Sequence, residues 1–321
     1  MREVVFIKKN KEKWQEYEKI LQQGNAVKNS EITSIYLDIT DDLAYANTYY
    51  PHSKTTEYLH QLAGIAHRKI YKTKKESANS IKRFYLDSFP RMFYPYRKYL
   101  IYAWIFFILF AIIGAFSAAK DGEYVRLIMG DNYVDMTIEN IKKGDPMAVY
   151  KSGGETASFL AITINNIKVA LNSFIYGLLL GIGTLYMLIR NAVMLGSFQY
   201  FFYKYGVFWE SVRTIWIHGT IEIFSIVVAI TAGWVLASGI LIPGTYTRKE
   251  SFIRRAKDGT KIMLSTIPFF IIAGFFEGFV TRHTEMPVIL SILIILGSLL
   301  LMIYYYFILP EKLTKKHKNY E

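Results

Sequence analysis

Three ionisable side chains lie within stretches that are otherwise almost wholly apolar. His218 and Glu222 are four residues apart, so they share one face of a helix. Glu277 lies in a later apolar stretch, and Thr281 follows it one helical turn on. An ionisable group inside a membrane helix costs roughly 2.5–3.5 kcal/mol on insertion scales, so each of these groups needs an explanation.

Two amides, Asn165 and Asn166, open another apolar stretch. Polar groups of this kind often serve as contacts between membrane helices, each worth about 1 kcal/mol or less. Ser, Asn or Gln would make such contacts at lower cost than a carboxylate, which favours a proton-linked or ion-binding site for the acidic residues. A metal site with His218, Glu222 and Glu277 as ligands is a further alternative, because imidazole and carboxylate groups both bind metal ions. The residues leave these three interpretations open.

The elements that must position these groups are membrane helices. The chain of 321 residues is 52% hydrophobic and only 20% charged, whereas a soluble domain carries about 25% charge. Residues 100–119 contain no charged side chain and are long enough to span roughly 30 Å as a helix. We therefore predict an all-α, polytopic helical membrane protein with about six transmembrane helices. The predicted spans are 100–119, 160–189, 191–208, 212–242, 263–281 and 287–309.

The charge distribution orients these spans. The net charge of +12 comes from an excess of Lys and Arg in residues 1–99, 244–262 and 310–321, whereas residues 120–158 have an acidic excess. Basic segments of membrane proteins concentrate in the cytoplasm. We therefore expect both termini in the cytoplasm and an extracytoplasmic segment over 120–158, formed by a helix or two lying over the outer face. In this orientation the polar groups of the spans all fall in the extracytoplasmic half of the membrane.

The predicted organisation has three parts: a cytoplasmic helical region over 1–99, a transmembrane core over 100–309, and a basic cytoplasmic tail over 310–321. Apolar spacing in the first part predicts helices over 3–22, 31–50 and 54–71. Arg91, Arg97 and Lys98 alternate with aromatic residues just before the first span. Cations and rings in that position favour contact with lipid headgroups over binding to nucleic acid. The absence of Cys excludes disulfides and thiolate chemistry, and no motif points to a cofactor.

Several spaced motifs resemble the stage II sporulation protein M family of integral membrane proteins. Those in the apolar part are Asn165-Asn166, Gly177, Gly181, 191–196, His218-Gly219-Thr220-Ile221-Glu222, Pro243-Gly244 and Glu277-Gly278-Phe279-Val280-Thr281. Those near the front are Phe6-Ile7-Lys8-Lys9-Asn10 with Trp14, Tyr50-Pro51 with Ser53, and Ala66-His67 with Ile70-Tyr71. The resemblance implies a prokaryotic inner-membrane protein. In spore formers, the named member of this family works as a membrane scaffold for peptidoglycan-degrading partners. The cytoplasmic front of this chain departs from the short sporulation type.

Three functional hypotheses follow. The first is a non-enzymatic membrane scaffold, forming a homo-oligomer among membrane lipids and anchoring envelope-remodelling partners. The alternative is a proton- or cation-linked transporter or flippase that uses His218, Glu222 and Glu277. The third is a membrane-embedded metal hydrolase. No nucleophile elbow, Gly-rich phosphate loop or HExxH motif supports an enzyme.

Overall fold

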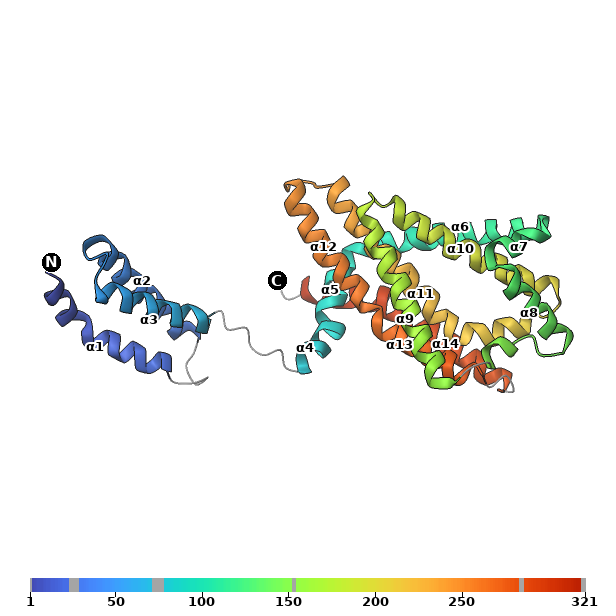
Figure 1. The fold of residues 1–321 in the computed structure, drawn as a ribbon, viewed down its shortest axis with the longest axis horizontal. Helices are drawn as coiled ribbons and strands as arrows, with labels where there is room; N and C mark the ends of the chain where they lie inside the picture. The colour runs from blue at the N-terminus through green and yellow to red at the C-terminus, as the bar shows by residue number, and fades with distance from the viewer. Residues whose placement is uncertain (1, 23–28, 71–77, 152–153, 283–285, 319–321) are drawn as a thin grey trace. The chain divides into compact units, whose positions relative to one another are not determined.

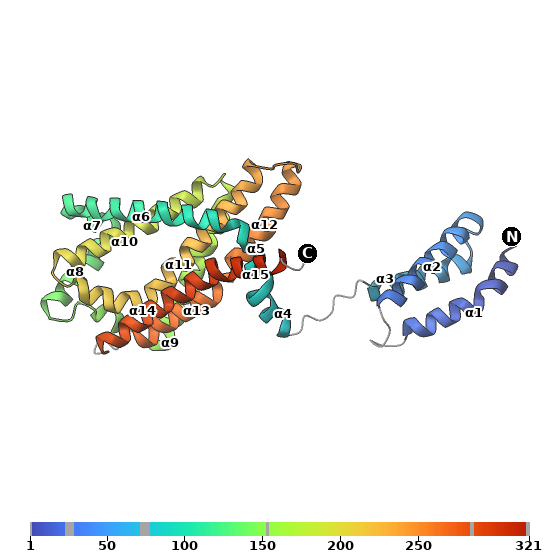
Figure 2. The same cartoon turned by 180° about the vertical axis from the view of Figure 1, so that it is seen from behind.

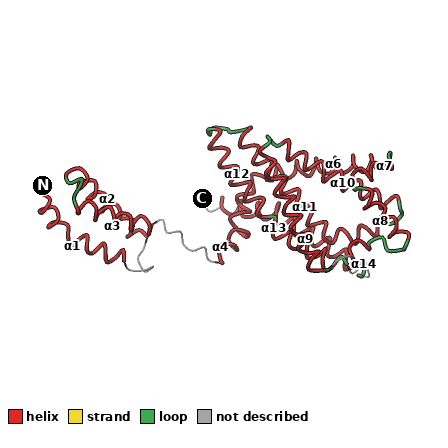
Figure 3. The backbone as a smooth tube through the Cα atoms, in the orientation of Figure 1, coloured by secondary structure: helices red, strands yellow, loops and turns green. Residues whose placement is uncertain are grey.

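The computed structural model describes residues 2–22, 29–70, 78–151, 154–282 and 286–318. These residues form helices and connecting loops and contain no strand (Figure 3), so the predicted all-α fold class is confirmed. The chain divides into two compact units, Met1–Ser80 and Ile81–Glu321. The predicted boundary at residue 99 lies too far along the chain, because Phe89 and Phe93 are fully buried in the second unit.

The amino-terminal unit contains the three helices α1 (Glu3–Gln22), α2 (Asn29–Tyr49) and α3 (Lys54–Ile70), shown in blue in Figure 1. Their bounds match the predicted helices to within two residues, although Tyr71 lies outside the described residues. Trp14, Ile39 and Leu59 are buried where the helices meet.

The second unit is built around α11 (Phe208–Leu241), most of whose residues are buried. Figures 1 and 2 show α11 running through the middle of this unit among the other long helices. The elements before it are α4 (Ala78–Arg83), η1 (Phe84–Ser88), α5 (Phe89–Phe93), η2 (Tyr94–Tyr96), α6 (Arg97–Lys120), α7 (Gly122–Met129), α8 (Asp131–Lys142), η3 (Ala148–Lys151), α9 (Glu155–Ile175), η4 (Tyr176–Leu178) and α10 (Ile182–Lys204). Those after it are α12 (Arg248–Ser265), α13 (Ile267–Phe275), η5 (Phe276–Val280), α14 (Val288–Ile303), η6 (Tyr304–Ile308) and α15 (Leu309–Lys318).

Among the described residues, five helical segments are long and apolar enough to cross a membrane. They are Ser80–Lys120, Glu155–Leu178, Phe208–Leu241, Arg248–Val280 and Val288–Lys315. The predicted third span, 191–208, is not among them; it falls mainly within α10, which carries Arg190 and Lys204. α10 nevertheless packs along α6 more extensively than any other pair of helices packs. Gly114 of α6 approaches Val193, and Ala118 further along α6 is buried in one cluster with Phe201 and Phe202, so the two helices run in the same direction.

The predicted second span, 160–189, is wrong in its end point. The helix stops at Leu178, and the chain turns through Leu180 and Gly181, which both have positive φ angles of 52° and 82°. Gly181 accepts this conformation at little cost because it lacks a Cβ. The break at 179–181 therefore replaces the one predicted between 189 and 191.

The predicted cytoplasmic loop 244–262 is also mostly helical. Thr247 caps α12 by accepting a hydrogen bond from the Glu250 N–H, and the helix continues through α13 to Val280 with only a turn at Thr266. Basic side chains mark the end of a membrane span, but they do not end a helix, since Lys and Arg are good helix formers.

Glycines set the close contacts between the helices of this unit. Gly177 lies directly against the backbone of Gly233, and Gly274 and Gly278 lie against α9 near Thr163 and Phe159. These contacts fix α9 beside α11 and bring α13 and η5 against α9. The site described next lies between these helices.

Candidate functional site

A cavity of about 590 Å³ lies among α9, α10, α11 and η5, with further lining from α7 and α8. Its polar lining residues are Tyr133, Asn165, Asn166, His218, Glu222 and Glu277. Its apolar lining includes Ile162, Leu195, Phe198, Trp216 and Ile223. The cavity thus gathers five of the six polar residues singled out from the sequence.

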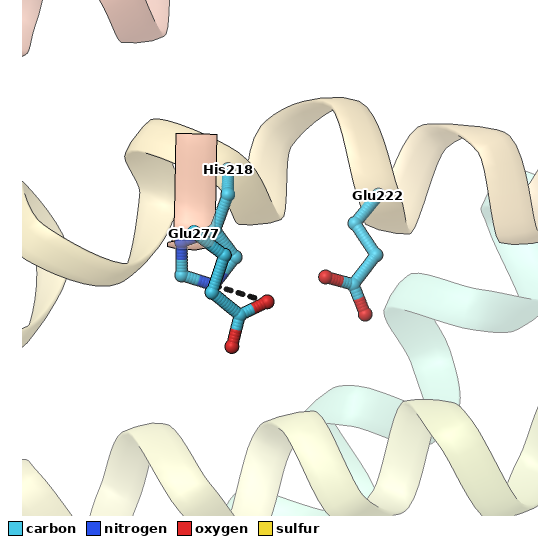
Figure 4. Close-up of side chains that lie close together, drawn as sticks. All are labelled: His218, Glu222 and Glu277. Carbon is cyan, nitrogen blue, oxygen red and sulfur yellow. Dashed lines mark ion pairs between the residues drawn. The ribbon is translucent and has the colours of Figure 1, made fainter. Parts of the chain in front are cut away.

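His218, Glu222 and Glu277 converge within this cavity (Figure 4). Each offers one metal-ligand atom, and these atoms all lie within 4.8 Å of one another. His218 Nε2 is 3.7 Å from Glu277 Oε2, and the carboxylate of Glu222 points toward the same place from one turn along α11. The helical spacing of His218 and Glu222 therefore has the predicted consequence, and a second element supplies the third group.

Thr281 holds the imidazole of His218 in place. Its Oγ1 lies 3.0 Å from His218 Nδ1, and both side chains are buried, at 1% and 4% exposure. With Nδ1 engaged by the hydroxyl, Nε2 is the ring nitrogen directed at Glu277. Thr281 does not itself line the cavity but orients a residue that does.

Both amides of α9 line the cavity. Asn166 is 5% exposed, and its Nδ2 atom has no hydrogen-bond partner within the described residues. Gly177 packs on Gly233, and eleven residues before these glycines Asn166 and Glu222 line the same cavity. α9 and α11 are therefore parallel, which places Asn166 and Glu222 at the same level.

Tyr133 of α8 also lines the cavity, and sequence reasoning did not identify it. Its ring lies beside that of Phe198, with 6.4 Å between the ring centroids. Burial raises the pKa of Tyr133 to about 12, so its hydroxyl is protonated at neutral pH. The available signal was weak: Tyr133, Val134 and Thr137 share one face of a short helix in the segment 120–158.

The basic residues singled out before the first span lie elsewhere. Arg91 donates to Leu313 O and pairs with Asp87, while Arg97 donates to Phe307 O and pairs with Glu311.

These contacts connect α5 and α6 to η6 and α15, so Arg91 and Arg97 have structural partners within the protein. Lys98 is exposed and lies over the ring of Tyr99, with 5.6 Å from Nζ to the ring centroid. Contact of these cations with lipid headgroups stays a prediction.

The arrangement can bind a cation or hold and pass protons. Within the described part of the chain, neither Glu222 nor Glu277 forms an ion pair with Lys or Arg. Two carboxylates placed this close need a proton or a cation to offset their mutual repulsion. An imidazole nitrogen aimed at the same point adds a ligand and a proton acceptor.

Comparisons with known proteins agree with the membrane character of the second unit. Residues 103–282, more than half of the chain, match the family described as Stage II sporulation protein M. Residues 4–72 match a family described as Domain of unknown function (DUF8413).

An uncharacterized protein of Methanocaldococcus jannaschii, MJ0706, is 31% identical over 126 residues, which cover 38% of this chain and 55% of that protein. The chain thus aligns with little more than half of that relative. No solved structure matches the chain.

Proposed function

The chain belongs to the stage II sporulation protein M family of membrane proteins, and we propose that its membrane core is a proton- or cation-linked transporter. One observation carries this proposal: His218, Glu222 and Glu277 come from two helical segments and meet at a cavity of about 590 Å³. Ionisable groups in membrane segments that face a cavity typically mark an ion or proton pathway.

A purely structural role for these groups fits the geometry less well. Polar groups that join helices are packed against a partner, whereas Glu222 and Glu277 line a cavity and have no Lys or Arg partner in the described residues. The cavity, with apolar walls from α10 and α11, leaves enough volume for a small polar solute beside the carboxylates.

The transport proposal is tested with the purified chain in proteoliposomes that contain a pH-sensitive dye. A membrane potential should drive proton movement in wild type, and Glu222→Gln should reduce it at least about tenfold, as expected for loss of a proton-transfer group. Glu210→Gln is the matched control, because Glu210 lies on the same helix but outside the cavity. Flux that equals empty liposomes in wild type, or that survives in Glu222→Gln, would reject the proposal.

The orientation has its own test. We place both termini in the cytoplasm of a prokaryotic cell, from the concentration of basic residues at α12 and the tail. The chain has no Cys, so single cysteines report cleanly. Cysteine at Lys257 should resist an impermeant reagent added from outside, whereas cysteine at Lys142 in α8 should react. Labelling at Lys257 would reverse the orientation.

A second candidate function is a scaffold, which the amino-terminal unit supports. This unit is compact in its own right and matches a separate domain family. We propose it as a cytoplasmic docking module for envelope-remodelling partners, attached to a homo-oligomeric membrane core. Deleting residues 1–80 should leave proteoliposome flux intact but abolish complementation of a null strain. Full complementation by the shortened chain would remove the scaffold role.

A further inference from the structure

We propose that His218, Glu222 and Glu277 bind one divalent transition-metal ion of the Zn²⁺ class. The ligands would be His218 Nε2 and one carboxylate oxygen from each glutamate. This inference rests on the proposed function, because it takes the cavity to be a cation site and names the cation.

The distances fit a small metal ion. Zn²⁺ bonds to imidazole nitrogen and carboxylate oxygen are about 2.0–2.2 Å long, which separates tetrahedral ligand atoms by about 3.3 Å. His218 Nε2 and Glu277 Oε2 are 3.7 Å apart, and all three ligand atoms lie within 4.8 Å.

The ligand types favour a transition metal over Mg²⁺ or Ca²⁺. Those two ions prefer oxygen ligands, whereas an imidazole nitrogen suits Zn²⁺ and its neighbours. Three protein ligands also leave one position open, as in zinc sites that bind a water or a substrate. The cavity next to the three groups provides the space for that fourth ligand.

The groups around the ligands support the same assignment. Thr281 Oγ1, 3.0 Å from His218 Nδ1, is positioned to accept the Nδ1 proton, and in that tautomer Nε2 carries the lone pair that would bind the metal. A hydrogen bond of this kind on the second ring nitrogen accompanies almost every metal-bound histidine. The buried Nδ2 of Asn166 has no partner in the described residues and lines the same cavity, where it can donate to a metal-bound oxygen.

Charge balance gives a further reason. Glu222 and Glu277 have no Lys or Arg ion-pair partner in the described part of the chain. A divalent cation at this point neutralises both carboxylates at once, and an uncompensated buried charge is costly.

The test uses the full chain, purified in detergent without a polyhistidine tag, stripped with chelator and dialysed against Zn²⁺. Elemental analysis should find one Zn²⁺ per chain. His218→Gln and Glu277→Gln should each weaken binding by more than the roughly 10–100-fold that loss of an outer-shell partner costs. His60→Gln, the same change at an exposed site in the amino-terminal unit, should bind Zn²⁺ as wild type does.

Thr281 supplies a second pair of variants in case His218→Gln does not fold. Thr281→Ala should weaken Zn²⁺ binding about 10–100-fold, and Thr281→Ser should restore it, because only the hydroxyl is needed to hold the ring. Wild-type chain without stoichiometric Zn²⁺ would overturn the inference. So would His218→Gln and Glu277→Gln variants that fold and bind Zn²⁺ with unchanged affinity.

Failure of this inference is distinguishable from failure of the proposed transport. A chain that binds no Zn²⁺ but retains Glu222-dependent proton flux in the presence of chelator would overturn the metal site and leave the transporter. A chain that binds one Zn²⁺ through His218 but moves neither protons nor Zn²⁺ would support the metal site and reject the transporter.

Discussion

The amino-terminal unit and the cavity of the second unit use acidic side chains in opposite ways. In the amino-terminal unit, carboxylates accept hydrogen bonds from neighbouring helices: Trp14 Nε1 lies 2.7 Å from Asp42 Oδ2, and Tyr17 Oη lies 2.6 Å from Asp38 Oδ2. In the membrane core, Glu222 and Glu277 face a cavity together with His218. The carboxylates of the amino-terminal unit thus join helices to one another, whereas Glu222 and Glu277 line a cavity.

This difference separates structural from functional polar groups. Asp42 receives both the Trp14 N–H and the Lys13 ammonium, so its charge is compensated within the unit. The core instead packs through a large apolar cluster around α11 and through close backbone contacts at glycines, such as Gly177 on Gly233. The core therefore does not need its carboxylates for packing, and retaining them calls for a ligand or a proton.

The largest expected effect is on the glycine contacts. Gly177→Ala places a Cβ against the Gly233 carbonyl, and overpacking of this kind costs about 1–3 kcal/mol or more. Gly219→Ala is the control, because its Cβ would meet only Ile215 Cγ2, at 3.9 Å. The unfolding temperature in detergent should fall strongly for Gly177→Ala and stay near the wild-type value for Gly219→Ala. Equal unfolding temperatures for the two variants would show that the contact at Gly177 does not stabilise the core.

A smaller loss of stability is expected from a substitution in the amino-terminal unit. Asp42→Ala removes the acceptor of the Trp14 N–H and the partner of Lys13, which costs about 1–3 kcal/mol for a buried donor left unsatisfied. Amide hydrogen exchange of α1 and α2 in the full chain measures this loss. Asp41→Ala, at the exposed neighbouring position, should leave exchange unchanged. Equal protection in both variants would mean that Asp42 is not a structural partner.

The smallest effect concerns pH. Burial, together with the hydrogen bond to Asp38, raises the pKa of Tyr17 to about 12. Because the folded state holds this proton more tightly, the stabilisation is complete below the ordinary pKa of about 10 and is lost as pH rises through 12. The difference in alkaline absorbance between wild type and Tyr17→Phe should show one phenol titrating near pH 12. Titration near 10 would show that the contact is not retained in solution.

Much of the fold was predictable because it depends on local pattern. The helix α1 has the predicted bounds because its apolar residues recur at helical spacing. The turn at Leu180 and Gly181 was missed because the hydropathy of 178–182 is uniform, so nothing polar interrupts the apolar run. The sequence instead predicts the break at Arg190, yet α10 continues through this residue because the packing of α10 against α6 outweighs the polarity of the side chain.

The site was predictable only in part. The spacing of His218 and Glu222 indicates a shared face, and the charge distribution indicates that Glu277 lies at a similar depth. Which helix faces which is a tertiary property, so neither the cavity nor its Tyr133 lining follows from the pattern. The role of Thr281 as a partner of His218 likewise required the structure, because sixty-three residues separate them.

The most direct test of this comparison is the unfolding temperature of the double variant Glu222→Gln/Glu277→Gln, measured in detergent beside wild type. We expect a midpoint equal to or above that of wild type, because removing the two negative charges relieves their repulsion and gives up only the 3.7 Å contact between Glu277 and His218. A fall as large as that caused by Gly177→Ala would contradict it, and would make these glutamates structural groups like Asp42.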